Sequence, residues 1–89
     1  MTYTVPTQAS KAGTGSEVTQ AIPANCTGFW LKSSGGTTTY SWSSSGSAAG
    51  TPLEDGVSRP FNDANLAGRT IYLTMAVGVT AFFNFHYDN

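Results

Sequence analysis

Residues 29–42, FWLKSSGGTTTYSW, decide the fold that the sequence predicts. Two runs of alternating apolar and polar side chains flank Gly35-Gly36, and a two-residue glycine loop favours the primed turns of β-hairpins, which need positive φ. We therefore expect a hairpin that pairs Phe29 with Trp42 and Leu31 with Tyr40, because this register makes one face apolar. The opposite face would carry Trp30, Lys32, Thr39 and Ser41.

A second hairpin is predicted from residues 70–75 and 79–87. A two-residue loop, Val77-Gly78, competes with a three-residue loop over residues 76–78. The longer loop makes every member of one face apolar and places Gly78 at its left-handed position, so we adopt it. It pairs Met75 with Val79, Leu73 with Ala81 and Ile71 with Phe83. The outward face would then be mixed, with Tyr72 directly across from Phe82 and with Thr70, Thr74, Thr80, Asn84 and His86 around them.

The rest of the chain contains further strands and turns. We expect a strand over residues 16–22, an edge strand over 57–61 because Pro60 cannot donate to a ladder, and one helical turn at 62–67. The long connection 43–56 is expected to cross between sheets. Six to seven strands predict an all-β chain that forms a small antiparallel β-sandwich or a jelly-roll-like barrel. Residues 1–15 are expected to form an extended N-terminal arm and residues 16–89 the single sandwich domain.

The composition limits the partners that we expect. Only 10% of the 89 residues are charged and the net charge is −1, so no electrostatic field favours nucleic acid or an anionic membrane. No run approaches the ~20 apolar residues of a membrane span, and the N-terminus lacks a signal-peptide pattern. A domain of this size has a thin stability margin and Cys26 has no disulfide partner, so we expect a homo-oligomer or docking onto a larger body.

The candidate reactive groups do not combine into a catalytic or metal-binding pattern. His86 has no evident orienting carboxylate, and Cys26 is expected to be a small buried residue. Glu54 and Asp55 are adjacent, so in extended chain their carboxylates point to opposite sides. Residues 63–74 begin like a calcium loop but lack the bidentate Glu at position 12. We therefore expect no enzyme activity, no cofactor and no metal.

Outward aromatic side chains are the feature that remains to be explained. Trp30, Tyr72 and Phe82 could be buried against another subunit, which we favour because the core is marginal. They could instead stack on sugar rings beside Asn, Ser and Thr. The candidate interface residues are Tyr3, Val5, Trp30, Tyr72, Phe82 and His86.

Three segments carry a family resemblance: AIPANCTGFWLK at 21–32, PLEDGV at 52–57 and LAGRTIYL at 66–73. Over residues 18–87 the chain resembles small virion proteins of tailed bacteriophages that are encoded near capsid genes. The resemblance implies a β-sandwich or jelly-roll decoration (cement) protein, often trimeric, at inter-capsomer junctions of the capsid. It assigns no functional residue, because the shared pattern is structural.

The leading hypothesis is a non-enzymatic capsid decoration protein that is assembled in the host cytoplasm and lies on the capsid surface. Its partners would be the major capsid protein and its own copies, in a trimer, and its arm would clamp neighbours by strand addition. Two alternatives stay open. One is a carbohydrate-binding β-module of a tail fibre or host-attachment protein, and the other is a component of the head–tail connector.

Overall fold

The computed structural model describes residues 8–43 and 46–87, which form eight strands and two short 3-10 helices. The elements are β1 (Gln8–Ala12), β2 (Glu17–Ala21), β3 (Cys26–Ser34), β4 (Thr38–Ser41), η1 (Ser47–Ala49), β5 (Thr51–Leu53), β6 (Ser58–Phe61), η2 (Ala64–Leu66), β7 (Thr70–Thr74) and β8 (Thr80–Tyr87). The all-β sandwich that the sequence predicts is confirmed, with eight strands in place of six to seven.

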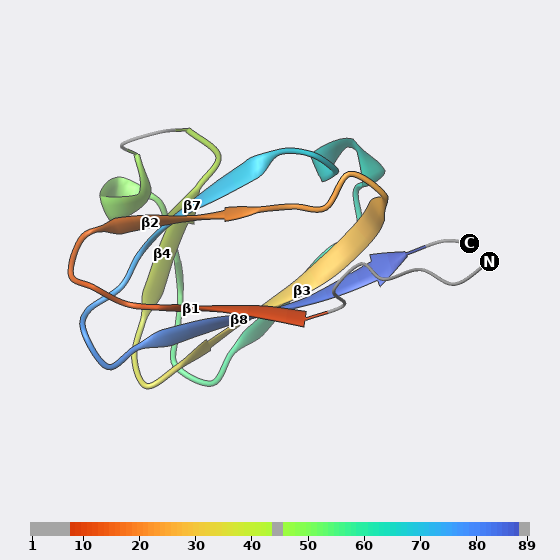
Figure 1. Ribbon diagram of the computed structural model, residues 1–89. Coiled ribbons are helices and arrows are strands. Elements are labelled where there is room, and N and C mark those ends of the chain that lie inside the picture. The colour runs from red at the N-terminus through yellow and green to blue at the C-terminus, as the bar shows by residue number, and fades with distance from the viewer. Residues whose placement is uncertain (1–7, 44–45, 88–89) are drawn as a thin grey trace.

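The strands form two antiparallel sheets packed face to face (Figure 1). Sheet A has the order β1-β8-β3-β6, and sheet B has the order β2-β7-β4-β5. The ladders include β1 with β8, β2 with β7, β3 with β6 and β4 with β5. The first strand thus pairs with the last, the second with the second-last, and so on toward the middle of the chain. Successive pairs belong alternately to sheet A and sheet B. This is the eight-stranded jelly roll.

Strict alternation along the strands builds the core between the sheets. In β8 the odd-numbered side chains from Ala81 to Phe85 are buried while Phe82, Asn84 and His86 are exposed. Such a period of two places one side of each strand in the core and the other on the surface. The buried apolar set is Ile22, Cys26, Phe29, Leu31, Tyr40, Leu53, Ile71, Leu73, Met75, Val79, Ala81, Phe83 and Phe85.

The predicted hairpin around Gly35-Gly36 is wrong in its pairing, although its faces are correct. β3 lies in sheet A between β8 and β6, whereas β4 lies in sheet B between β7 and β5. Phe29, Leu31 and Tyr40 are buried as expected, but they meet across the core instead of side by side. The physical reason is that two apolar faces cover each other when the strands lie in opposite layers, while a flat hairpin would leave its apolar face without a cover.

The turn between β3 and β4 is built for this change of sheet. Gly35 has φ +90°, which favours glycine. The hydroxyls of Ser33 and Thr38, both fully buried, lie 2.8 Å apart and bond to each other across the turn. Ser33 Oγ also donates to the carbonyl of Gly36. Two buried polar groups thus satisfy each other where the chain leaves sheet A.

The second predicted hairpin is corrected in the same way. β7 belongs to sheet B and β8 to sheet A, so the loop over residues 76–78 is a corner between the layers. Its local details agree with the prediction, since Gly78 has φ +94° and the Val79 N–H donates to the Ala76 carbonyl at 3.1 Å. Tyr72 and Phe82 are therefore not neighbours, because they lie on the outer faces of different sheets.

The start of the sandwich also differs from the prediction. Residues 8–12, which were expected in the arm, form edge strand β1 and pair with β8, so the sandwich starts before residue 16; residues 1–7 lie outside the described part. The connection 43–56 crosses between the sheets as predicted, since it leads from β4 in sheet B to β6 in sheet A. It also contains strand β5, which was not predicted and which pairs with β4 before the chain crosses. β6 is an edge strand that contains Pro60, as predicted.

Candidate functional site

The candidate interface residues divide between the two outer faces of the sandwich. Trp30, Phe82 and His86 project from the outer side of sheet A, where Trp30 is 42% and Phe82 46% exposed. Tyr72 is half-buried on the outer side of sheet B, so it cannot share a surface with them. Tyr3 and Val5 lie outside the described residues. The structure thus brings three of the six predicted residues onto one face.

The register of sheet A sets the pattern of side chains on its outer side. One row across the four strands reads Gln8, Asn84, Trp30, Pro60, and the next reads Ser10, Phe82, Lys32, Ser58. All eight side chains are exposed. We call these eight residues the aromatic face.

Two large rings on this face occupy a diagonal. Trp30 lies opposite Asn84 and Lys32 lies opposite Phe82, so an indole, an amide, an ammonium group and a phenyl ring form one block on β3 and β8. Side chains directly opposite are about 5 Å apart at Cβ, and diagonal ones about 7–8 Å. The two rings can therefore contact the same ligand, with polar groups between them.

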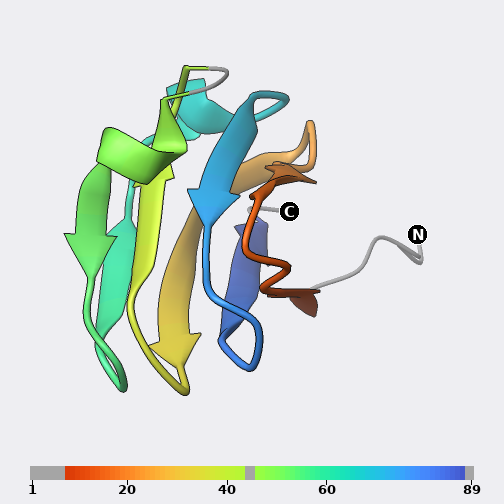
Figure 2. The same cartoon turned by 90° about the vertical axis from the view of Figure 1, so that its left-hand side faces the viewer.

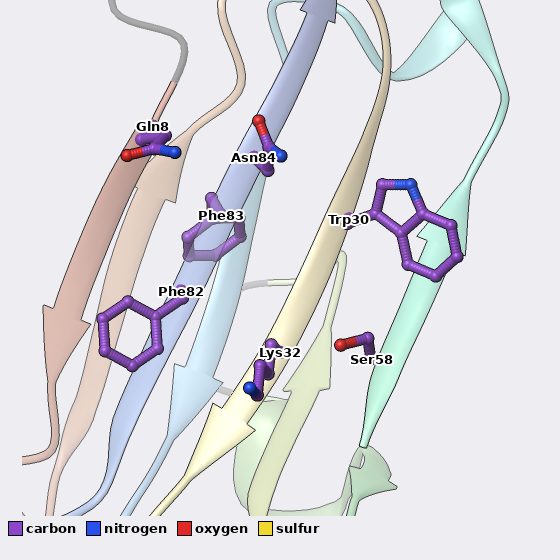
Figure 3. A pocket seen from close by; sticks show the side chains of 7 residues that line it. All are labelled: Gln8, Trp30, Lys32, Ser58, Phe82, Phe83 and Asn84. Atoms are coloured by element: carbon purple, nitrogen blue, oxygen red, sulfur yellow. The ribbon is translucent and has the colours of Figure 1, made fainter. Parts of the chain in front are cut away.

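A shallow depression of about 470 Å³ lies over this block. Its lining residues are Gln8, Trp30, Lys32, Ser58, Phe82, Phe83 and Asn84. Figure 3 shows the Trp30 ring leaning toward β6 and the Phe82 ring leaning toward β1, with Asn84 and Lys32 between them. The volume falls within the ~300–1,000 Å³ range of small-molecule sites.

The charge in the lining of the depression is positive. Among residues 8–43 and 46–87, Lys32 is the only charged side chain in its lining. The carboxylates of the described chain belong to other segments: Glu17 in β2, Glu54 and Asp55 in the turn before β6, and Asp63 before η2. The aromatic face therefore offers a cation and no anion to a partner.

Aromatic packing beneath the face holds its backbone in place. Phe29 stacks on Phe61 with ring centroids 4.6 Å apart, and Phe83 stacks on Phe85 at 5.8 Å. These rings lie on the inner sides of β3, β6 and β8, the strands that carry Trp30 and Phe82 outward. Buried aromatic contacts of this kind fix the spacing of the outward side chains.

The outer side of sheet B differs in chemistry. Its outward side chains are mostly small or hydroxyl-bearing, and η1 packs over part of it (Figure 2). Ser47 of η1 is fully buried: its N–H donates to Glu17 Oε2 at 3.2 Å, its hydroxyl also bonds to that oxygen, and Thr74 Oγ1 lies 2.6 Å from Ser47 Oγ. This side is partly covered by its own chain, unlike the aromatic face.

The other groups considered as reactive occupy structural positions. Cys26 is buried, and its thiol donates to the Gly28 carbonyl at 2.9 Å. Asp55 Oδ1 accepts from the Gly35 N–H, and Asp63 Oδ1 accepts from the Asn65 N–H, both at 2.9 Å in exposed turns. Across residues 8–43 and 46–87, no three His, Cys, Asp or Glu side chains gather as a metal site. None of the helices in that part is long and apolar enough to cross a membrane.

Sequence reasoning missed two polar residues of the site, Gln8 and Ser58. They join Trp30, Phe82 and Asn84 only because β1, β8, β3 and β6 are neighbours in sheet A. The available signal was alternation within single strands, which groups Trp30 with Lys32 and Phe82 with Asn84. It does not tell which strands are adjacent.

The chain was also compared with known proteins. It matches no protein-family model, no curated protein and no solved structure.

Proposed function

We propose that this chain is a non-enzymatic structural protein of a bacteriophage virion: a capsid decoration protein that binds at capsomer junctions as a homo-oligomer. The observation that carries the proposal is the aromatic face, where Trp30 and Phe82 are exposed on a diagonal of the same surface with a single charged residue, Lys32. Aromatic side chains in a surface with little charge are enriched at protein interfaces, because they bury large areas without desolvating ions.

The fold and the composition support the same proposal. Double-sheet jelly rolls occur in viral capsid proteins and in lectins, so the architecture suits a binding or assembly role without choosing between them. A chain with 10% charged residues packs against a neighbour at little electrostatic cost.

Capsid binding tests this function directly. The purified chain is mixed with capsids that lack it, from the phage that encodes it, and the bound fraction is measured after sedimentation. Trp30→Ala and Phe82→Ala should each weaken binding at least ~10-fold, the effect of an interface residue worth more than 1.4 kcal/mol. Tyr72→Ala is the matched control, since it removes an aromatic ring from the opposite side of the sandwich. Equal binding by all four proteins would refute the proposal.

The native mass of the oligomer separates decoration from a connector role. We expect a trimer for a decoration protein, whereas a head–tail connector component would form a ring with more subunits. A stable monomer that does not bind capsids would contradict both roles.

A second candidate function is carbohydrate binding, which a specific observation favours. The depression combines two ring faces with the amides of Gln8 and Asn84 and the hydroxyl of Ser58. Ligand sites typically pair an apolar lining with a few polar groups that fix orientation. Under this function, Trp30→Ala abolishes glycan binding and leaves the oligomeric state unchanged; under the first, it disrupts capsid or subunit contacts.

A further inference from the structure

The polar groups of the aromatic face have a chemistry that selects among ligands. We infer that the depression binds an acidic sugar, with the sugar rings on Trp30 and Phe82 and the carboxylate at Lys32. This inference rests on the second candidate function and names its ligand class.

The two rings would supply the contact area. The C–H faces of a pyranose are apolar, and covering an aromatic ring that is 42–46% exposed removes apolar surface of both partners from water. The negative face of an aromatic ring also attracts the polarised C–H groups of the sugar. Since Trp30 and Phe82 lie on a diagonal and lean apart, they fit two successive sugar units better than one (Figure 3).

Lys32 supplies the preference for an anion. It lies directly across from Phe82 and two residues from Trp30 on the same strand. A carboxylate on a sugar stacked at Phe82 therefore reaches its ammonium group. In the part of the chain that the structure describes, no carboxylate lines the depression to compete for it. Charge-assisted hydrogen bonds of this kind are about twice as strong as neutral ones.

The amide and hydroxyl groups match the remaining atoms of a sugar. Gln8 and Asn84 face each other across β1 and β8, and each amide can both donate and accept. Ser58 lies beside Lys32 on the other flank. The hydroxyl groups of a glycan also donate and accept hydrogen bonds. They can therefore bond to Gln8 and Asn84 on one flank of the depression and to Ser58 on the other.

A nucleic acid fits this face less well. Single strands also stack on aromatic rings, but the proteins that bind them add a positively charged groove along the backbone. Only one cationic side chain of the described residues lines the depression. One ammonium group is enough for an acidic sugar that brings one carboxylate to the depression. A nucleic-acid strand carries a phosphate at every nucleotide and would need more cationic side chains.

Binding of matched acidic and neutral sugars to the full chain tests the inference. The probes are trigalacturonate with its methyl ester, 3′-sialyllactose with lactose, and a thymidine hexanucleotide, measured by calorimetry at low salt. At least one acidic sugar should bind at least ~10-fold more tightly than its neutral counterpart, because the ion-supported contact is lost in the ester or in lactose. Lys32→Met should remove this preference, and Trp30→Ala should abolish binding of both members of the pair.

Two control variants isolate the depression. Lys11→Met removes the same charge from β1, outside the lining, and Tyr72→Ala removes a ring from sheet B; both should bind like the unchanged chain. Equal binding of acidic and neutral sugars would overturn the inference and leave carbohydrate binding in place. Binding of no sugar would overturn both, and binding of the hexanucleotide alone would assign the face to single-stranded nucleic acid instead.

Discussion

Gly13→Ala tests how the corners of the jelly roll pack. Gly13 is buried at the corner between β1 and β2, and its N–H donates to the Val79 carbonyl at 2.7 Å. A Cβ at this position would lie 2.1 Å from the carbonyl oxygen of Ala76 and 2.8 Å from Met75 Cβ. The obstacles belong to the β7–β8 corner, so one of the two corners must move.

Gly15→Ala is the matched control two residues away. Gly15 has φ +82°, but no atom lies within 4 Å of a Cβ built on it. Its replacement therefore costs only the left-handed conformation, ~1–2 kcal/mol. Overpacking at Gly13 costs ~1–3 kcal/mol, and weakening its hydrogen bond adds ~1 kcal/mol, for a total of ~2–4 kcal/mol.

Thermal unfolding followed by circular dichroism measures the difference. At ~4–8 °C per kcal/mol for a chain of this size, Gly13→Ala should lower Tm by ~8–32 °C and Gly15→Ala by about half as much, ~4–16 °C. If Gly13 belonged to a loose arm ahead of two flat hairpins, its replacement would leave Tm unchanged. A Gly13→Ala variant as stable as Gly15→Ala would therefore refute the corner packing.

Three further predictions concern side chains that the fold satisfies internally. Ser47→Ala should destabilise the chain by ~1–3 kcal/mol in urea unfolding, because Glu17 loses a buried donor; an unchanged midpoint would contradict this. Arg59 Nη1 donates to Tyr40 Oη at 2.7 Å, so a double-mutant cycle with Arg59→Met and Tyr40→Phe should give a coupling of ~1 kcal/mol, and additive effects would exclude it. Burial raises the pKa of Tyr87 above its usual 10.0, so the folded state keeps this proton at a pH where the unfolded state releases it. The contribution of the protonated Tyr87 to the free energy of unfolding is fully present below pH 10 and is lost as the pH rises further. Tyr87→Phe should therefore make the fall in stability above pH 10 shallower in urea unfolding.

The sequence predicts the direction of most side chains but not the neighbours of the strands. Alternation assigns Ile71, Leu73, Ala81 and Phe83 to the core, and all four are buried. The same pattern is satisfied by a flat hairpin and by two strands in facing layers. Pairing by proximity in the chain chose the hairpin, whereas mutual covering of the apolar faces selects opposite sheets.

Strand β1 was missed because its signal is weak. QASKA alternates only between small and polar side chains, with Ala9 as its apolar contribution to the core. An edge strand needs less apolar character than a central one, because it contacts the core along one margin. Pro60, by contrast, placed β6 at an edge correctly, since the missing N–H is a property of the residue itself.

The candidate site was predictable only in part, for the same reason. Trp30 and Phe82 could be recognised as outward aromatic residues from their own strands. Their shared face, the addition of Gln8 and Ser58 and the removal of Tyr72 all depend on the order β1-β8-β3-β6. This order comes from contacts between segments that are far apart in the chain.

Hydroxyl-radical footprinting of the chain on capsids tests the central claim, that the aromatic face is the surface that binds a partner. Oxidation rates of Trp30, Phe82 and Tyr72 are measured by mass spectrometry in the free and the bound protein. We predict that binding slows the oxidation of Trp30 and Phe82 severalfold, while Tyr72 on the other side of the sandwich keeps its rate. Unchanged rates at Trp30 and Phe82 in the bound protein, or protection of Tyr72 alone, would contradict the claim.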